Sequence, residues 1–436
     1  MTREIKSVAV IGGGTMGAGI AGKCADAGCR VLLIDKDEAA VAKAMERVTG
    51  GRMPAIDNPE SAKLIETGTF DDLGRIAGYD WICEAVIEDL ATKRALFEKL
   101  EAARSEGSVI STNTSGIPLR SIVEGMPARL RRDVVVTHFF NPVKVMKLLE
   151  VVPSEDTTPD VVAAMAAFGA AKLGKGVVHA KDTVNFIGNR IGCFWMLSGL
   201  HKAKAARAKG LSMETIDALM SAPVGLPSTG LYGLIDLIGL DVMDFVGKNL
   251  AVNLPKDDVG RAFTSFPAEE QAMFGRGQLG RKTGGGFYRV SKTEDGGKLK
   301  ETFDLDTGDW RHAGEPELMP AHHELATLMA AQDACGAFAR DLMGGTLLYA
   351  ADLVPQIADD IVNIDRAMRW GFAWQKGPFE MLDALDPAAM AAAMKARGEK
   401  LPAMLEVLDR AGAKSFYRKD GAEYLGRDGA WHAVPA

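Results

Sequence analysis

The first part of the chain alternates short apolar runs with stretches of helical periodicity. Residues 7–12 (SVAVIG) form an apolar run that ends on glycine, residues 16–27 have the spacing of a helix, and a second apolar run follows as RVLLID. Similar runs recur as DWICEAV, SVISTN, DVVVTHFF and GVVHA, separated by helical stretches such as LATKRALFEKLEAA. This alternation predicts an α/β domain over residues 1–181, with a doubly wound, largely parallel sheet covered by helices.

After residue 181 the pattern changes to long amphipathic helices. We predict an all-α domain, a polar linker with little periodicity, a second helical region and a small tail, which cover residues 182–290, 291–319, 320–412 and 413–436. The tail contains Asp-Gly pairs at 420–421 and 428–429, which are typical of hairpin turns, so we expect a small β-hairpin there.

The helical part contains an internal repeat. Residues 215–241 and 363–386 share an Ile-Asp pair, a glycine-rich turn and the pattern Gly-x-aromatic-x-x-x-Asp, at offsets of 148 and then 147 residues. Chance similarity of two amphipathic helix pairs is the alternative explanation. The order and spacing of the shared residues favour two copies of one helical unit.

Length, charge and hydrophobicity indicate a multidomain protein and argue against binding to nucleic acid or membrane. A chain of 436 residues exceeds what one hydrophobic core usually organises, so two or more domains are expected. With 51 basic and 58 acidic residues the net charge is -7, and no basic cluster is long enough to bind a nucleic acid backbone. The chain reaches its first strand by about residue 7 and has no apolar run of membrane-spanning length. We therefore expect a cytoplasmic protein that binds neither nucleic acid nor membrane.

The cysteines indicate the same compartment. They are odd in number, scattered and without the spacing of metal ligands: Cys24, Cys29, Cys83, Cys193 and Cys335. Such a pattern is typical of reduced, buried thiols in a cytosolic protein. No metal site is expected.

A glycine-rich turn predicts a dinucleotide site. Gly12, Gly14 and Gly17 follow the order G-x-G-x-x-G, close one strand and open a helix, and Asp35 ends the next strand 23 residues after Gly12. This is the context of a Rossmann-type fold, in which the helix N-terminus binds the pyrophosphate. The carboxylate of Asp35 would accept the ribose hydroxyls and repel the additional phosphate of NADP, so NAD is preferred. A turn without a ligand and a site for FAD are the alternatives.

Polar side chains at the ends of two predicted strands suggest a catalytic site beside that turn. His138 follows DVVVT and Ser115 follows SVISTNT. Ligands of doubly wound sheets bind beyond the carboxyl ends of the strands. A return over twelve residues can place Glu150, in KLLEVV, opposite His138. The carboxylate would fix the imidazole tautomer and stabilise the imidazolium, which makes an acid-base pair.

Each of these residues has a structural explanation when taken singly. A histidine near an apolar strand is more often a satisfied structural residue, and a glutamate in LLEVV is often the solvent face of a half-buried strand. Asn189, in NFIGNRIGC, lies on an apolar helix face, where an amide either bonds a core neighbour or faces a cleft. The residues alone leave these alternatives open.

Taken together, the motifs resemble the L-3-hydroxyacyl-CoA dehydrogenase family of fatty-acid β-oxidation. Seven segments occur in the family's order: VIGGGTMGAGIA, EAVIEDLATK, STNTS, HFFNPVKVMKLLEVV, KDTVNFIGNRI, TGLYGLIDLIGLD and GRKTGGGFY. The resemblance implies NAD-dependent oxidation of an L-3-hydroxyacyl-CoA to a 3-oxoacyl-CoA. It assigns the general base to His138, its carboxylate partner to Glu150, and the groups that bind the substrate oxygen to Ser115 and Asn189.

The same resemblance implies further cofactor contacts, which are Glu88, Lys93, Asn141 and Lys282. The family's helical arm, which touches CoA, is short here, so no CoA-binding lysine can be assigned by resemblance. Arg47, Arg52 and Lys63 are the candidates for phosphate contacts.

The duplicated helical unit resembles multifunctional β-oxidation proteins, in which a dehydrogenase is joined to an enoyl-CoA hydratase module. That module, or other β-oxidation subunits, would be the partners. The second copy lacks a counterpart of NFIGNR, which favours a packing role, and it would replace the partner with which single-unit enzymes dimerise.

Two other functions are compatible with the sequence. A β-hydroxyacid dehydrogenase shares a Rossmann domain followed by helices, but it acts on free acids and uses a catalytic lysine. A non-catalytic, NAD-binding scaffold subunit of a β-oxidation complex would bind cofactor without turnover. The combination of Ser115, His138, Glu150 and Asn189 argues against a scaffold, since a scaffold needs no base with a carboxylate partner.

Overall fold

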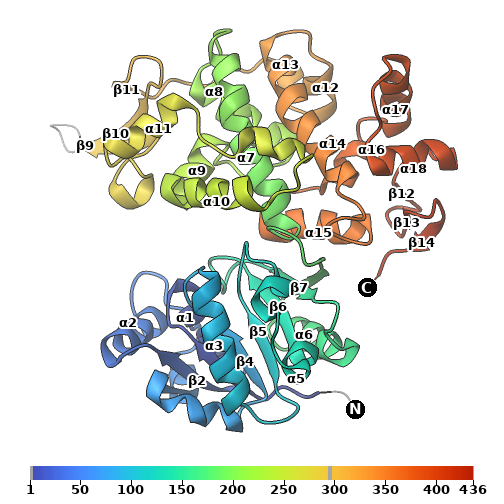
Figure 1. The fold of residues 1–436 in the computed structure, drawn as a ribbon. Coiled ribbons are helices and arrows are strands. Elements are labelled where there is room, and N and C mark those ends of the chain that lie inside the picture. Colours follow the sequence, from blue (N-terminus) through green and yellow to red (C-terminus); the bar gives the residue numbers. More distant parts are fainter. Residues whose placement is uncertain (1–2, 293–296, 436) are drawn as a thin grey trace. The chain divides into compact units, whose positions relative to one another are not determined.

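The computed structural model describes residues 3–292 and 297–435 (Figure 1). The chain forms two compact units. The first comprises residues 1–187 and 356–359, and the second comprises residues 188–355 and 360–436. Among the described residues, no helix combines the length and the apolar character needed to cross a membrane.

The first unit is built on one eight-stranded sheet. Its strands are β1 (Ser7–Ile11), β2 (Arg30–Asp35), β3 (Ile65–Thr69), β4 (Trp81–Glu84), β5 (Val109–Thr112), β6 (Val134–Phe139), β7 (Leu148–Pro153) and β8 (Gly176–His179). They lie in the order β3-β2-β1-β4-β5-β6-β7-β8. All neighbours are parallel except β6 and β7. The order of the first six strands is that of a dinucleotide-binding fold, and the predicted α/β class is confirmed.

Helices cover this sheet: α1 (Thr15–Asp26), α2 (Glu38–Thr49), α3 (Leu90–Ala103), α4 (Leu119–Val123), α5 (Ala128–Asp133) and α6 (Pro159–Ala171), with 3₁₀ turns η1 (Pro59–Leu64) and η2 (Phe70–Gly78). Aspartates begin two of the helices: Asp37 accepts a hydrogen bond from the Ala40 amide and Asp89 from the Thr92 amide. Strands β1, β5 and β6 are buried along their whole length, because helices cover both faces of the sheet, as expected for parallel strands.

The second unit is mainly helical. Helix α7 (Gly188–Arg207) is buried along most of its length and packs against α10, α13, α14 and α15 (Figure 1). The remaining helices are α8 (Met213–Leu219), α9 (Tyr232–Ile238), α10 (Leu240–Asn253), α11 (Ala268–Gly275), α12 (Leu325–Ala330), α13 (Ala334–Ala339), α14 (Gly345–Asp352), α15 (Ile361–Gly371), α16 (Pro378–Asp383), α17 (Pro387–Ala396) and α18 (Ala403–Ala411). The predicted helical region with a duplicated unit is confirmed.

Two small antiparallel sheets complete this unit. One consists of β9 (Tyr288–Lys292), β10 (Lys298–Phe303) and β11 (Trp310–His312), and the other of β12 (Tyr417–Arg418), β13 (Glu423–Leu425) and β14 (Trp431–Ala433). The first occupies much of the predicted linker at 291–319, of which residues 293–296 lie outside the described residues. The second has three strands where a hairpin is predicted. The domain boundaries at 181, 290, 319 and 412 stay predictions.

Polar cross-strand contacts explain why these strands are hard to recognise. Arg289 pairs with Glu301 at 2.7 Å and lies 4.2 Å over the ring of Trp310. In the second sheet, the guanidinium of Arg418 pairs with Glu423 at 2.5 Å and lies 4.3 Å over the ring of Trp431. Because charged pairs and a cation–π contact hold each sheet together, its sequence lacks the apolar alternation of a half-buried strand.

The duplication extends to individual hydrogen bonds. In the first copy, Asp217 accepts from the Tyr232 and Gly233 amides and from the Tyr288 hydroxyl, while Asp236 accepts from the Phe287 and Tyr288 amides. The second copy repeats every one of these bonds with Asp365 and Asp383 as the acceptors and with donors on Phe379, Glu380, Phe416 and Tyr417. The repeat therefore reaches from each helix pair into the sheet that follows it.

Candidate active site

The glycine turn between β1 and α1 has the shape of a phosphate cradle. A Cβ on Gly17 would lie 1.7 Å from the Gly12 carbonyl oxygen, and Gly12 itself has a φ of +101°, so both positions require glycine. A Cβ on Gly14 would meet nothing within 4 Å, which leaves open space over that residue. Gly14 begins α1 without a side-chain cap, so the first helical amides lack a side-chain acceptor. An anion such as a pyrophosphate fits this position.

Asp35 lies beside that turn at the end of β2. Its Oδ2 accepts a hydrogen bond from the Gly13 amide at 2.7 Å, and its Oδ1 accepts from the Lys36 amide at 2.7 Å. The carboxylate is therefore held at the carboxyl edge of the sheet next to the glycine turn. This is the arrangement in which an acidic residue accepts the ribose hydroxyls of NAD, so the residues present fit the group.

His138 and Glu150 form a buried pair. They are direct partners across the antiparallel strands β6 and β7, and His138 Nδ1 lies 2.6 Å from Glu150 Oε2. His138 is 4% exposed and Glu150 is not exposed at all. The second carboxylate oxygen, Oε1, accepts from the Ile187 amide at 3.0 Å. Since a carboxylate only accepts hydrogen bonds, Nδ1 is the protonated nitrogen and the lone pair of the neutral ring lies on Nε2.

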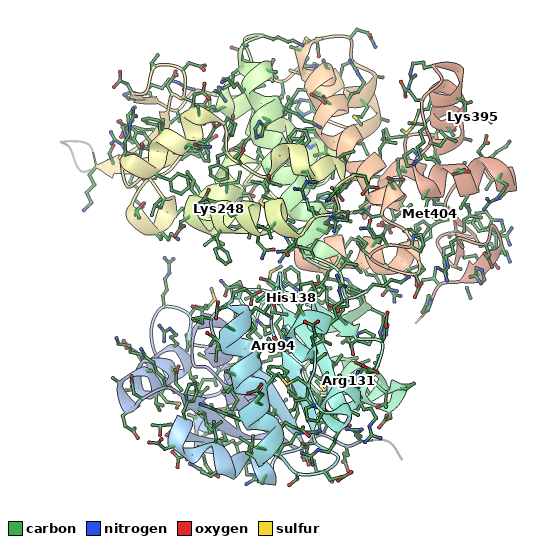
Figure 2. All side chains as sticks on the ribbon, viewed as in Figure 1. Arg94, Arg131, His138, Lys248, Lys395 and Met404 are labelled. Atoms are coloured by element: carbon green, nitrogen blue, oxygen red, sulfur yellow. The ribbon has the colours of Figure 1, made fainter. Side chains whose placement is uncertain are left out.

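Aromatic rings fix the plane of this imidazole. The centroids of Phe140 and Phe186 lie 4.5 Å and 5.6 Å from that of His138. Phe186 and its neighbour Asn185 both have positive φ, at +48° and +61°, a conformation that is costly for residues with side chains. This backbone places the Phe186 ring against the histidine and the following amide against Glu150. Strain of this kind is concentrated at functional sites. Figure 2 labels His138 at the strand ends of the first unit.

The segment STNTS connects the elements of the site. Ser111 bonds Thr137 and Trp81, Thr112 bonds Glu84, Asn113 accepts from the amide of Phe139, and Thr114 bonds Glu88. Within the described part of the chain, Ser115 is the one member whose side chain makes no such bond. The segment thus holds β4, β5 and β6 together while its last hydroxyl stays available to a ligand.

Glu88 holds the backbone around Ser115. Its Oε1 accepts hydrogen bonds from the amides of Ser115 and Gly116, each at 2.9 Å, in addition to the Thr114 hydroxyl. Burial alone would raise the pKa of Glu88, but the charge of Lys93 and these hydrogen bonds outweigh it and lower the pKa. Glu88 is therefore a fixed anion beneath the loop.

Lys93, for which a cofactor contact is expected, is 1% exposed. Its ammonium group lies 2.7 Å from Glu84 Oε1 and 3.3 Å from Glu88 Oε2. Glu84 and Asn113 are residues that the sequence reasoning missed. A polar residue ending an apolar strand, as in WICE and VISTN, is the pattern that would have drawn attention to both.

Asn141 lines a cavity of about 680 Å³ beside the glycine turn. The cavity is formed by the start of α1, the end of α2 and the segments that follow α2 and β6. Its basic residues are Lys43, Arg47, Arg52 and Lys144. Lys63, the third candidate for a phosphate contact, lies elsewhere on η1 and pairs with Glu60 at 2.5 Å.

Asn189 and Lys282 belong to the second unit. Asn189 is the second residue of α7 and is half-buried. Lys282 lies in a 3₁₀ turn (Arg281–Thr283), and its ammonium group is 2.5 Å from Asp241 Oδ1. Their contributions to substrate and cofactor binding stay predictions.

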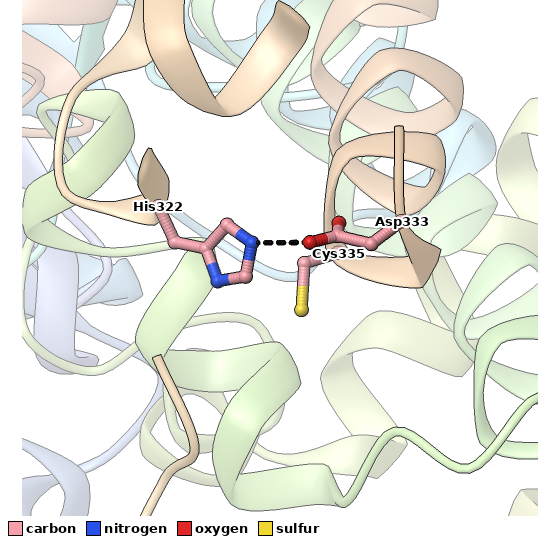
Figure 3. A group of neighbouring side chains, drawn as sticks. All are labelled: His322, Asp333 and Cys335. Carbon is pink, nitrogen blue, oxygen red and sulfur yellow. Dashed lines mark hydrogen bonds and ion pairs between the residues drawn. The ribbon is translucent and has the colours of Figure 1, made fainter. Parts of the chain in front are cut away.

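One group of side chains in the described residues has the composition of a metal site: His322, Asp333 and Cys335, whose ligand atoms lie within 4.8 Å of one another (Figure 3). His322 Nδ1 accepts from the Met319 amide, so Nε2 carries the proton that it donates to Asp333 at 2.7 Å. A metal-binding histidine needs one nitrogen lone pair for the metal and donates a hydrogen bond from the other nitrogen. In His322 the lone pair of Nδ1 is already used by the Met319 amide. Burial also raises the pKa of the Cys335 thiol, which disfavours the thiolate. The hydrogen bonds fit a helix cap better than a metal site.

Two family models match the chain. Residues 7–183 match the NAD binding domain of 3-hydroxyacyl-CoA dehydrogenase, and residues 186–290 match the C-terminal domain of the same enzyme.

Curated relatives carry the same description. A probable 3-hydroxyacyl-CoA dehydrogenase of Deinococcus radiodurans is 38% identical over 67% of this chain and 84% of its own length. One of Bacillus subtilis is 32% identical over the whole of this chain and 58% of its own length. A putative fatty acid oxidation complex trifunctional enzyme of Rickettsia felis is matched over 53% of its length at 34% identity. The chain thus spans a little over half the length of the latter two.

Solved structures agree with the observed fold. The (S)-3-hydroxybutyryl-CoA dehydrogenase of Ralstonia eutropha superposes with a TM-score of 0.56 at 30% identity, over 66% of this chain and 100% of that protein. The 3-hydroxybutyryl-CoA dehydrogenase of Escherichia coli covers 93% of this chain and 98% of its own, with a TM-score of 0.68 at 24% identity. The second likeness concerns the fold alone, and it extends over the duplicated unit.

Proposed function

Because the chain belongs to the 3-hydroxyacyl-CoA dehydrogenase family, we propose that it oxidises the 3-hydroxyl group of an L-3-hydroxyacyl-CoA to a 3-oxo group in fatty-acid β-oxidation, with NAD as the oxidant. The observation that carries the proposal is the buried contact of 2.6 Å between His138 Nδ1 and Glu150 Oε2. It leaves an unprotonated Nε2 at the carboxyl edge of the sheet, which is where a doubly wound fold binds its ligands.

In this proposal, His138 is the general base. Its Nε2 accepts the proton of the substrate 3-hydroxyl, and Glu150 stabilises the imidazolium that results. Ser115 and Asn189 donate hydrogen bonds to the substrate oxygen and so hold it near the base. Bound NAD would supply the acceptor for the hydride that leaves the substrate carbon.

The proposed cofactor contacts lie at the same edge of the sheet. The amides at the start of α1 bind the pyrophosphate and Asp35 binds the ribose, as the open space over Gly14 and the position of the carboxylate support. Glu88 and Asn141 lie at the same edge of the sheet and complete the coenzyme site, with Lys93 behind Glu88. Lys282 is a further coenzyme contact that the family resemblance implies.

We assign the CoA phosphates to the cavity that Arg47 and Arg52 line. Lys43 adds a further positive charge, whereas Lys144 is paired with Asp57 at 2.7 Å and Glu46 also lines the cavity. Guanidinium groups bind phosphate through paired donors. This basic set would take over the task of the helical arm that is short in this chain. Lys63 is not among the lining residues and receives no such role.

The test is NADH formation from CoA thioesters of L-3-hydroxy acids of varied chain length. We expect turnover with thioesters and a loss of about 10² to 10⁴-fold in His138→Gln with the fold retained. Preference for the free hydroxy acids would identify a β-hydroxyacid dehydrogenase instead. Binding of NADH without turnover at any chain length would identify a scaffold subunit.

We also propose the cytoplasm as the compartment and a separate enoyl-CoA hydratase, or another β-oxidation subunit, as partner. Five unpaired cysteines, four of them buried, support a reducing compartment. The matched family models describe dehydrogenase domains alone, so hydration of the enoyl-CoA requires another module. Cell fractionation and the mass of the natural protein in a cell extract test both statements.

A further inference from the structure

Beneath the Ser115 loop lies a chain of buried charges that begins at Glu84, the last residue of β4. The Glu84 side chain is fully buried. Its Oε1 accepts from the Val86 amide and from the Lys93 ammonium group, both at 2.7 Å, and its Oε2 accepts from the Thr112 hydroxyl at 2.6 Å. The carboxylate therefore joins the ends of β4 and β5 to α3.

The next link is Lys93, which lies between two carboxylates. Its side chain is 1% exposed, and its ammonium group bridges Glu84 Oε1 and Glu88 Oε2. Glu88 is 19% exposed and accepts three hydrogen bonds from Thr114, Ser115 and Gly116. Charge thus alternates from Glu84 through Lys93 to Glu88, and the last member binds the backbone of the loop.

We propose that Glu84 is a positioning residue for Ser115. It anchors Lys93, and Lys93 fixes the carboxylate of Glu88 that binds the Ser115 and Gly116 amides. Lys93 consequently acts on the Ser115 loop through Glu88. The inference rests on the proposed function for the role of Ser115, but the chain of contacts stands without it.

The physical reason lies in burial. A lysine out of water stays charged only beside a carboxylate, and removal of one partner leaves the other as an uncompensated buried charge. Without Glu84, Lys93 either loses its proton or moves toward Glu88 alone. Both changes alter the acceptor beneath the loop, and small displacements of a positioning group cost large factors in rate.

The main test is Glu84→Gln in the full-length chain. We expect faster amide hydrogen exchange over residues 113–117 and a fall in kcat of about 10- to 100-fold. Combined with Ser115→Ala, the substitution should add no further loss, because both act through one hydroxyl. Losses that multiply in the double variant would overturn the inference.

Glu101→Gln is the matched control. Glu101 also pairs with a buried arginine, Arg104, at 2.6 Å, but near the C-terminal end of α3, and its other partner is Arg129, so neither ion pair involves the loop. It should lower the melting temperature without changing exchange at residues 113–117 or kcat. Equal exchange effects in Glu84→Gln and Glu101→Gln would reduce Glu84 to a general stabilising residue.

Thr112→Val keeps the test decisive if Glu84→Gln folds poorly. It removes the hydrogen bond to Glu84 Oε2 at nearly constant volume, and it also removes the acceptor of the Thr114 amide. Exchange is therefore compared at Ser115 and Gly116, whose amides are bound by Glu88, and a smaller change of the same kind is expected there. Exchange at these two amides equal to that of the wild type would contradict the inference. The exchange measurement needs no turnover, so it separates a failure of this inference from a failure of the proposed dehydrogenase activity.

Discussion

Glu150 fixes the tautomer of His138 and would also stabilise the positive charge of the protonated ring. We therefore expect Glu150→Gln to lower kcat by about 10² to 10⁴-fold, because an amide neither fixes the protonated Nδ1 nor stabilises the imidazolium. Steady-state rates with a 3-hydroxyacyl-CoA, with circular dichroism to verify the fold, give the measurement. Glu155→Gln, at an exposed position five residues further on, is the control and should retain the rate.

Substitutions of Gly17 and Gly14 should distinguish an effect on folding from an effect on cofactor binding. Gly17→Ala places a Cβ 1.7 Å from a carbonyl oxygen, so it should destabilise the unliganded protein by about 1 to 3 kcal/mol. Gly14→Ala meets nothing within 4 Å and should leave the melting temperature unchanged while weakening NADH binding at least tenfold. Thermal unfolding and titration with NADH measure both. Wild-type affinity in Gly14→Ala would contradict the assignment of the pyrophosphate.

At the scale of single residues, the proximity of His138 and Glu150 was predictable from the sequence, because each follows or lies in a clear apolar run and strand pairing then places them opposite each other. Their catalytic roles stay predictions. Lys93 lies buried between two carboxylates, a position that the sequence did not predict, and its contact with the cofactor stays a prediction. Burial of a lysine depends on which carboxylates lie behind it in space, and spacing along the chain does not reveal that.

At the scale of elements, the repeated Asp–Tyr contacts predict that loss of the tyrosine hydroxyl destabilises the fold equally in both copies. Tyr288 donates to Asp217 at 2.8 Å and Tyr417 donates to Asp365 at 2.9 Å. Tyr288→Phe and Tyr417→Phe should each lower the free energy of unfolding by about 1 to 3 kcal/mol, because a hydrogen bond to a buried carboxyl group is lost. Chemical denaturation measures the change. A loss in one variant alone would show that the two contacts are not equivalent.

Helix α11 carries a buried carboxyl group that should make stability depend on pH. Burial raises the pKa of Glu270 to about 7, and neither oxygen has a hydrogen-bond partner among the described residues. The nearest charge is Arg207, with Nη1 at 4.0 Å. Since the folded-state pKa lies above the unfolded value, the stabilising contribution is complete below about pH 4 and is lost as the pH rises through about 7.

Glu270→Gln should therefore be more stable than the wild type at pH 8, by at most on the order of 3 kcal/mol, with no difference near pH 4. Denaturation at a series of pH values measures it. The neighbouring Glu269→Gln should behave in the opposite way, because a hydrogen bond from Lys204 lowers the pKa of Glu269. A pH-independent difference for Glu270→Gln would contradict the assignment of the charge.

Elements with continuous apolar runs were predictable, whereas the short polar strands β10 and β11 in the predicted linker were not, and the β structure of the tail was indicated only by its Asp-Gly turns. Strands β4, β5 and β6 coincide with predicted runs, since burial on both faces makes each strand start with apolar residues, and the polar residues come at the strand ends. Strands β10 to β14 have two to six residues and are joined by charged pairs, so residues 291–319 resembled a linker. Their equivalence became visible only through the matching contacts of the two copies.

For the whole molecule, the matched domains predict a single chemical step. Incubated with NAD and a 2-enoyl-CoA, the chain should form no NADH, because oxidation requires the 3-hydroxyl that hydration introduces. Addition of an enoyl-CoA hydratase should then start NADH formation, which is followed by absorbance. NADH formation from the enoyl-CoA by the purified chain alone would reveal a second activity.

Comparison of the two copies of the helical unit separates residues with a structural role from residues with a catalytic role. Residues that make the same contacts in both copies, such as Asp217 and Asp365, have a structural role, since one active site does not need two copies of a catalytic residue. The segment NFIGNR, which includes Asn189, occurs in the first copy and has no counterpart in the second. Differences between the copies therefore mark the positions where selection for turnover acts on the helical unit.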